Sequence, residues 1–350
     1  FVRQAVGAAM KMMGEIFVMG RTIGEALGRA RKGRNANYRY SYDMLGEAAL
    51  TAEDAAKYMA DYRQAVETVG AEPQVGPGPR PSVSIKLSAL HPRYEVAQRE
   101  RVLNELFASV RELAILARRL DVGITIDAEE ADRLELSLDV IAAAFADPSL
   151  AGWSGFGLAI QAYQKRATDV IDYIDALTRA LDRRMMVRLV KGAYWDTEIK
   201  RAQVFGRTDY PVFTTKAATD LNYLVCARAM IEASPAIYSQ FASHNAHTLA
   251  AVRRMARDRR VKIEHQRLHG MGEALYDAAI ERWSDETVIV RAYAPVGGHE
   301  ELLPYLVRRL LENGANSSFV HALLDERVPA SAVAADPITL IEQTPDRHPK

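Results

Sequence analysis

The chain has 350 residues, 49% of them hydrophobic and 26% charged, and its 45 basic residues balance 45 acidic ones. This composition predicts a globular protein with a sizeable core, and the balanced charge excludes an overall field that would hold nucleic acid or anionic lipid. The single cysteine, Cys226, excludes an internal disulfide and fits a reducing compartment, and no apolar run approaches the ~20 residues of a transmembrane helix.

The first 75 residues, 1–75, are expected to form an N-terminal helical arm. The stretch "MGEIFVMGRTIGEALGRA" reads as helical pieces without a strong amphipathic period, and "TAED" is a capping signal for a helix over residues 51–68. The glycine- and proline-rich "EPQVGPGPRP" then breaks the chain. The first residue is Phe1 rather than methionine, so we expect a piece of a longer protein.

Short β-prone runs alternate with helical patterns from Ser82 onward. These runs are "SVSIKL", "VGITID", "GFGLAI", "MMVRLV", a weak "YPVFTT", "QFAS", "VKIEHQ" and "VIVRAY". Most are too apolar to have one wet face, which indicates a parallel sheet covered by helices, and eight strands favour an α/β fold closed into a (β/α)8 barrel over residues 76–325. The rival is an open doubly wound sheet, but no G-x-G-x-x-G turn follows the first strand. The proline-rich tail, residues 326–350, is expected to be a linker or docking segment.

A helix is predicted over residues 303–314, "LPYLVRRLLENG". Its leucines and valine form one apolar stripe, whereas Tyr305, Arg308, Arg309 and Glu312 share the opposite face. This polar face has two readings. It is either a solvated surface with an Arg308–Glu312 ion pair, or a pair of guanidinium groups that binds a small carboxylate or phosphate.

Residues at the C-terminal ends of the strands form the reaction site in barrels of this kind. The side chains at these positions are Lys86, Asp127, Gln161, Arg188, Lys191, Tyr194, Trp195, Lys216, His244, Asn245, Arg267, Leu268 and Tyr293. So many polar and aromatic residues at strand ends predict a ligand that is large and partly aromatic.

Three alternatives stay open at these positions. Lys86 and Asp127 could simply neutralise each other as a buried ion pair. Two pairs of closely spaced histidines nominate a metal centre, although no cysteine is near and no carboxylates are obviously matched to them. Lys191, at a strand end, is compatible with the Schiff-base lysine of an aldolase.

Eight motifs together resemble a known family. They are "SYDMLGEAALT", "SIKLSALHPRYE", "TIDAEEADRLELSLDV", "IQAYQKRA", "VRLVKGAYWDTEIKRAQ", "FASHNAHT", "QRLHGMGEALYD" and "RAYAPVGGHEELLPYLVRRLLENGANSSF". In this order, from Tyr38 to Phe319, they are similar to the proline dehydrogenase domain of the bifunctional bacterial enzyme proline utilization A. The resemblance implies a TIM-like (β/α)8 barrel with an N-terminal helical arm and a last helix, residues 303–314, over the barrel mouth. It also implies an aldehyde dehydrogenase domain in the full-length chain.

The activity that the resemblance implies is FAD-dependent oxidation of L-proline to Δ1-pyrroline-5-carboxylate, the first step of proline catabolism to glutamate. A hydride passes from proline C5 to flavin N5, and the electrons pass on to a membrane quinone. The expected location is the cytoplasm, peripheral at the inner face of the bacterial membrane, with neither a metal nor a nucleic-acid partner for this fragment. The alternatives are the lysine-dependent aldolase and a non-enzymatic barrel that binds an amino acid or a nucleotide.

The resemblance also assigns residues to roles. The positions that match contacts of the substrate carboxylate are Lys86, Arg308 and Arg309. Glu47 matches the acid that pairs with the first of these arginines. The positions that match residues around the substrate ring are Leu189, Tyr194, Leu268, Tyr293 and Tyr305. The positions that match flavin contacts are Gln161, Arg188, Val190, Lys191, Trp195, Thr214, Thr215, Lys216, His244, Asn245 and Glu312. Asp127 matches an active-site aspartate, and Arg188 is the candidate for tuning the flavin as a fixed cation beside it.

Overall fold

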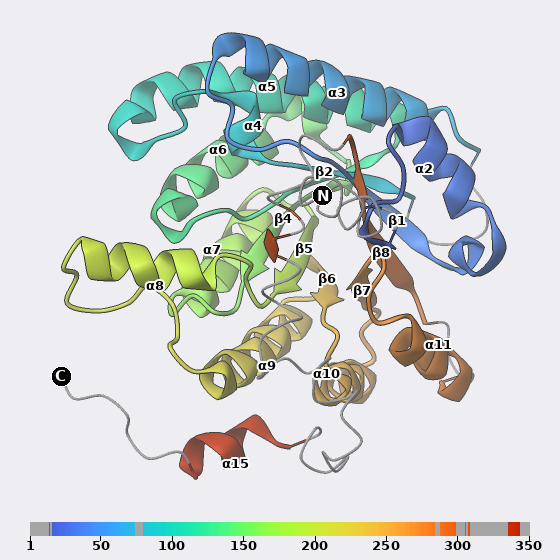
Figure 1. The fold of residues 1–350 in the computed structure, drawn as a ribbon, viewed down its shortest axis with the longest axis vertical. Helices are drawn as coiled ribbons and strands as arrows, with labels where there is room; N and C mark the ends of the chain where they lie inside the picture. Colours follow the sequence, from blue (N-terminus) through green and yellow to red (C-terminus); the bar gives the residue numbers. More distant parts are fainter. Residues whose placement is uncertain are drawn as a thin grey trace, which may run out of the picture.

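The computed structural model describes residues 14, 16–73, 80–283, 288–298, 305, 307–308 and 335–343. Eight strands form a closed barrel in which each strand is parallel to the next in sequence order, and the last pairs with the first (Figure 1). The strands are β1 Arg39–Met44, β2 Ser82–Ile85, β3 Gly123–Ile126, β4 Phe156–Gln161, β5 Met185–Val190, β6 Ile237–Ala242, β7 Glu264–Leu268 and β8 Val290–Val296. The predicted (β/α)8 barrel is therefore confirmed, and the open doubly wound sheet is excluded.

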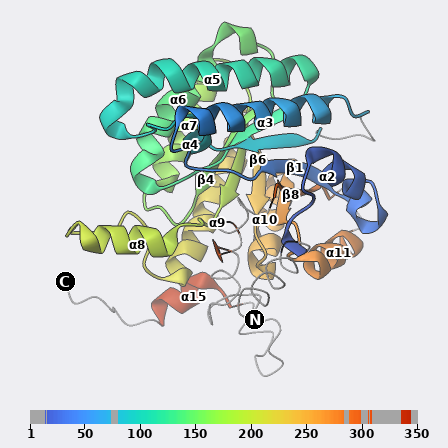
Figure 2. The ribbon, with the colours of Figure 1, turned by 45° about the horizontal axis from the view of Figure 1, so that its top comes forward.

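Helices surround the barrel (Figure 1), and α3 and α5 run side by side along one flank of it (Figure 2). The helices are α2 Ile23–Ala30, α3 Ala52–Gly70, α4 Leu87–Leu90, α5 Arg99–Leu120, α6 Leu134–Ala146, α7 Ala167–Ala180, α8 Trp195–Val204, α9 Lys216–Glu232, α10 Ala246–Arg259, α11 Glu273–Arg282 and α15 Pro337–Glu342. The apolar outer faces of the strands and the inner faces of these helices form one large buried core. Among the described residues, none of the helices is both long enough and apolar enough to cross a membrane.

The capping signal near residue 51 is confirmed. Thr51 is the N-cap of α3, and its side chain accepts a hydrogen bond from the backbone N–H of Asp54 at 3.1 Å. The Asp54 carboxylate accepts in return from the Thr51 N–H at 2.9 Å, which completes a capping box.

One predicted strand was wrong, and one real strand was missed. Residues 210–215 form no strand, and only Val212 makes an isolated antiparallel bridge, with Gln164. The missing strand is β1, which lies within residues 1–75, where only a helical arm was expected. Its sequence "RYSYDM" did not read as a buried strand because tyrosines, Tyr40 and Tyr42, alternate with the polar, barrel-facing Ser41 and Asp43.

The interior of the barrel is polar and is closed at the N-terminal end of the strands. Arg291, the second residue of β8, donates to both carboxylate oxygens of Glu264, the first residue of β7, at 2.7 and 3.0 Å. Both side chains are fully buried. This ion pair fills the bottom of the barrel, so the space for a ligand lies at the opposite end, where the strands terminate.

Candidate active site

Arg188 lies in the middle of the barrel with its guanidinium group fixed from several directions. Its Nε donates to Gln266 at 2.7 Å, Nη1 donates to Asp127 at 2.6 Å, and Nη2 lies 3.0 Å from the hydroxyls of both Ser41 and Ser84. The residue is only 3% exposed. Because four partners from four other strands or strand ends define its position, Arg188 is a fixed positive charge just below the barrel mouth.

Asp127, directly after β3, joins three of the predicted site residues. One carboxylate oxygen accepts from Arg188, and the other accepts from the Tyr293 hydroxyl at 2.6 Å and lies 3.6 Å from the Lys86 ammonium. The Arg188 guanidinium also stands 5.1 Å from the centre of the Tyr293 ring. The four residues therefore form one connected group, as the positions at the ends of β2, β3, β5 and β8 predicted.

The main partner of Lys86 is a residue that the sequence analysis missed. The Lys86 ammonium donates to Asp43 of β1 at 2.6 Å, a shorter contact than the one to Asp127. Burial alone would lower the pKa of Lys86, but the charges of Asp43 and its other neighbours raise this pKa well above its usual value. Lys86 thus keeps its positive charge. The simple Lys86–Asp127 pair is not what the structure shows, because Asp43 takes the nearer position.

A second cation comes from the helical residues 305, 307 and 308. Arg308 binds both oxygens of Glu47, at 2.7 and 3.0 Å, and its guanidinium lies 5.4 Å from the centre of the Tyr194 ring. Burial tends to raise the pKa of Glu47, but the hydrogen bond and charge of Arg308 bring this pKa below its usual value. The expected pairing of Glu47 with Arg308 is thus present. Arg309 and Glu312 lie outside the described residues.

Aromatic side chains stand beside these cations. Tyr305 is buried in a small cluster with Val18 and Leu45, and Phe17 and Tyr293 pack against this cluster. Tyr305 precedes Arg308 by about one helical turn, and Leu45 lies just before Glu47 on the segment after β1. The cluster therefore places apolar surface at the mouth.

The other predicted ring contacts divide into two kinds. Leu268 ends β7 two residues after Gln266, so strand alternation turns it toward the barrel interior. Leu189 adjoins Arg188 in β5 and belongs instead to the fully buried core between strands and helices. Its position does not support a contact with the ligand. Val190, two residues from Arg188, shares the inward face at the end of β5.

Two lysines and two helix N-termini occupy the rim beyond β5 and β6. Asp220 of α9 pairs with Lys191 and, at 2.6 Å, with Lys216. Thr215 is the N-cap of α9, next to the half-buried Thr214, and Asn245 is the N-cap of α10. Helix N-termini and lysines attract anions, so this rim is suited to a phosphate-bearing ligand.

Two further predicted residues line the same region. The Trp195 indole N–H, at the start of α8, donates to the Phe213 carbonyl at 2.9 Å, which ties α8 to the segment before α9. The His244 Nε2 accepts from the Leu268 backbone N–H at 3.1 Å. His244 is therefore engaged in positioning the end of β7, and among the described residues no group of three or more histidine, cysteine or carboxylate side chains is arranged to hold a metal.

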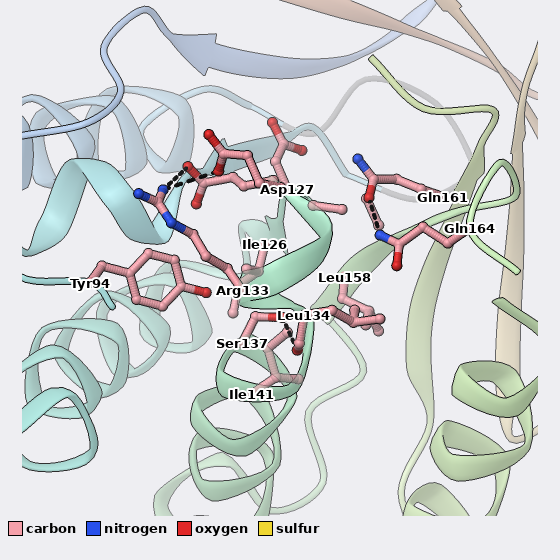
Figure 3. Close-up of a pocket in the computed structure, with 14 residues that line it drawn as sticks. Tyr94, Ile126, Asp127, Arg133, Leu134, Ser137, Ile141, Leu158, Gln161 and Gln164 are labelled. Carbon is pink, nitrogen blue, oxygen red and sulfur yellow. Dashed lines mark hydrogen bonds and ion pairs between the residues drawn. The ribbon is translucent and has the colours of Figure 1, made fainter. Parts of the chain in front are cut away.

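A cavity opens between the ends of β3 and β4 (Figure 3). Asp127 and Gln161 both line it, and Gln161 accepts a hydrogen bond from Gln164 at 2.7 Å. Arg133 reaches across its other side toward two glutamates (Figure 3). The cavity thus connects the inner group around Asp127 with the loop that follows β3.

Comparison with known proteins gives the family. A family model described as proline dehydrogenase matches residues 26–322. Bifunctional protein PutA is 53% identical in Klebsiella aerogenes, over 98% of this chain and 26% of that protein, and 53% identical in Escherichia coli K12, over 100% of this chain and 27% of that protein. Proline dehydrogenase 1 of Bacillus subtilis 168 is 25% identical over 87% of this chain and 88% of its own length.

Solved structures agree with these relatives. A mutant form of proline utilization A from Bradyrhizobium japonicum is 57% identical with a TM-score of 0.88, over 97% of this chain and 35% of that one. Proline utilization A from Bdellovibrio bacteriovorus, inactivated by N-propargylglycine, is 30% identical with a TM-score of 0.89, over 95% and 36% of the two chains. The present chain spans about a quarter of the length of the curated bifunctional relatives it matches. The chain belongs to the proline dehydrogenase family.

Proposed function

We propose that this chain oxidises L-proline to Δ1-pyrroline-5-carboxylate with bound FAD. The observation that carries the proposal is the pair of cations, Lys86 and Arg308, held beside an aromatic wall at the barrel mouth. Proline presents a carboxylate at one end and an apolar ring at the other, and this arrangement is complementary to both. Family membership supports the same substrate.

The substrate contacts follow from charge and shape. Lys86 and Arg308 each donate to the substrate carboxylate, with Arg309 as the proposed third contact. Tyr194, Tyr293, Tyr305 and Leu268 flank the ring. Because Asp43 and Glu47 hold the two cations in place before substrate arrives, less side-chain freedom is lost on binding.

The residues present fit a flavin dinucleotide. Arg188, Gln161 and Val190 face the barrel interior, where an isoalloxazine ring would rest. The rim formed by Lys191, Lys216, Thr214, Thr215, Trp195, His244 and Asn245 offers cations and helix N-termini for its diphosphate and ribose groups. When bound, FAD supplies the acceptor for the hydride from proline C5, at its N5 atom.

The chain's own residues position and tune this chemistry. Arg188 is a fixed cation inside the barrel and favours the more negatively charged, reduced state of a group placed beside it. Asp127 fixes Arg188 and Tyr293 together, so that both act from defined positions. Lys191 is engaged in an ion pair with Asp220, which argues against the free amine that the nucleophilic lysine of an aldolase requires.

The remaining parts of the proposal concern partners and location. We propose that the electrons pass to a membrane quinone, and that the protein is cytoplasmic and peripheral at the inner face of the membrane. The low share of the bifunctional relatives that this chain covers supports an aldehyde dehydrogenase domain in the full-length chain. We propose that residues 326–350 form a linker or docking segment. The contact between α15 and α9 supports this proposal.

An absorption spectrum tests the proposed function. The purified protein should be yellow, and anaerobic addition of L-proline should bleach the flavin band. D-proline, which presents its ring to the same cations with the opposite hand, is the control and should bleach it far more slowly. A colourless native preparation, or a flavin band that L-proline leaves unchanged, contradicts the proposal.

A further inference from the structure

The segment that carries Glu47 has an unusual backbone. Ala48 has a φ of 54° and Gly46 a φ of 149°. A side chain in the left-handed region meets its own backbone, so an alanine stays there only when its surroundings hold it. Since Glu47 lies between these two residues, whatever holds Ala48 also sets the position of the carboxylate that binds Arg308.

Ser88 supplies the contacts that hold this segment. Its hydroxyl accepts from the Ala48 backbone N–H at 3.0 Å, and its carbonyl accepts from the Ala49 N–H at 2.9 Å. Ser88 is 3% exposed and lies in the single turn of α4, two residues after Lys86. The segment from Lys86 to Ser88 therefore carries Lys86, one of the two cations proposed to bind the substrate. It also anchors the segment that positions Arg308, the other cation.

Ser88 is itself held from the opposite side by Glu129. Its backbone N–H donates to Glu129 Oε2 at 3.1 Å. Glu129 is buried in the loop after β3, two residues beyond Asp127, and Arg133 Nη1 lies 3.8 Å from its other oxygen. Burial raises the pKa of Glu129 to about 7, while the hydroxyl and N–H of Ser88 act in the opposite direction.

We infer that Ser88, held by Glu129, is a positioning residue for the substrate clamp, by which we mean the two cations Lys86 and Arg308. Ser88 fixes the segment of Glu47 and thereby the orientation of Arg308. The inference rests on the proposed function, because the clamp is the proposed site of the proline carboxylate. It extends the active site to a pair beyond the residues proposed to contact substrate and flavin. Removing the hydroxyl leaves the Ala48 N–H without its acceptor, so the segment loses a contact and Arg308 loses its fixed orientation.

The test uses the flavin-loaded protein and Ser88→Ala. The KM for L-proline should rise about fivefold to tenfold, as expected for one lost hydrogen bond, while kcat and flavin content stay within about twofold of wild type. Ser137→Ala is the matched control, because Ser137 lines the cavity beside Glu129 but donates to the Leu134 carbonyl of its own helix at 2.6 Å. Its KM should equal that of wild type.

A double variant separates positioning from general damage. In an Arg308→Met background the guanidinium that Glu47 orients is already absent, so adding Ser88→Ala should change KM by less than about twofold. The inference is wrong if Ser88→Ala leaves KM unchanged, or if its effect is as large with Arg308→Met as without it. Should Ser88→Ala fail to fold, Ser88→Cys keeps a small buried side chain with a poorer acceptor and must still raise KM.

A binding measurement without turnover distinguishes this inference from the proposed function. Cyclopentanecarboxylate keeps the acid and the ring but lacks the amine that is oxidised. Its dissociation constant, obtained from the rise in melting temperature with concentration, should increase about fivefold to tenfold in Ser88→Ala and not in Ser137→Ala. If wild type fails to oxidise L-proline, the proposed function is wrong, and equal affinity of wild type and Ser88→Ala for this acid is what refutes the positioning role.

Discussion

Arg308 is held by both oxygens of Glu47 rather than by solvent, which determines the cost of replacing it. Arg308→Met removes the proposed contact with the substrate carboxylate and leaves Glu47 partly buried without its partner. We expect KM for L-proline to rise about 30-fold to 100-fold, equivalent to roughly 2 to 3 kcal/mol, with flavin content unchanged. Steady-state kinetics and the ratio of flavin to protein absorbance measure both. Arg119→Met, on the exposed face of α5, is the control, and equal KM values for the two variants would show that Arg308 does not bind substrate.

Asp43 acts through Lys86, and this makes its role visible in a pH profile. Burial would lower the pKa of Lys86, and Asp43 is the largest influence that raises it. In Asp43→Asn this pKa falls, so Lys86 loses its proton at a lower pH. The ratio of variant to wild-type kcat/KM for L-proline should therefore decrease steadily as pH rises from 7 to 10. A ratio independent of pH would mean that Asp43 does not control the charge of Lys86.

Among the elements, β1 shows what the sequence could and could not reveal. The runs of β2 to β5 were found because their outward residues, such as Val83 and Ile85 of β2, are largely aliphatic and pack in the core against helices. In β1 the inward residues Ser41 and Asp43 bind Arg188 and Lys86, so the strand resembles a partly solvated segment. Hydrophobic periodicity detects aliphatic outer faces, so it misses a strand such as β1, whose outward residues are Tyr40 and Tyr42 and whose inward residues are polar.

The capping box of α3 sets the stability of the element that follows the Glu47 segment. Thr51→Ala removes the acceptor for the Asp54 N–H, which should cost about 1 kcal/mol and lower the melting temperature by roughly 1 to 3 °C. Thr68→Ala, near the other end of the same helix, is the control, since its hydroxyl donates to the Gln64 carbonyl, which α-helical bonding already serves. Calorimetry of both variants distinguishes them, and equal melting temperatures would show that the cap contributes nothing.

At the scale of the whole molecule, the positions of the site residues were predictable and their partners were not. A closed parallel barrel brings strand ends together, so Lys86, Asp127, Arg188 and Tyr293 had to meet at one mouth. Which carboxylate takes the nearest place beside each cation depends on register and side-chain length. Asp43 is nearer to Lys86 than Asp127 for this reason, and no spacing in the sequence specifies it.

Buried histidines make the stability of the whole barrel depend on pH. His265 is 4% exposed, its ring lies 5.8 Å from that of Trp283, and its Nδ1 has no hydrogen-bond partner within the described part of the chain. Burial, with the nearby charge of Arg253, lowers the pKa of His265 to about 4. The unfolded chain therefore binds a proton that the folded chain excludes between pH 6.5 and 4. The contribution of neutral His265 to the free energy of unfolding is complete above pH 6.5 and is lost as the pH falls toward 4.

His265→Leu should remove this dependence because leucine does not titrate. Between pH 7 and pH 5 the free energy of unfolding of wild type should fall by about 2 kcal/mol more than that of the variant. Urea unfolding at both pH values measures this difference directly, and His247→Leu, at a half-buried position of α10, is the control that should behave like wild type. An equal loss of stability in wild type and His265→Leu would mean that the folded protein accepts a proton at His265 as readily as the unfolded chain does.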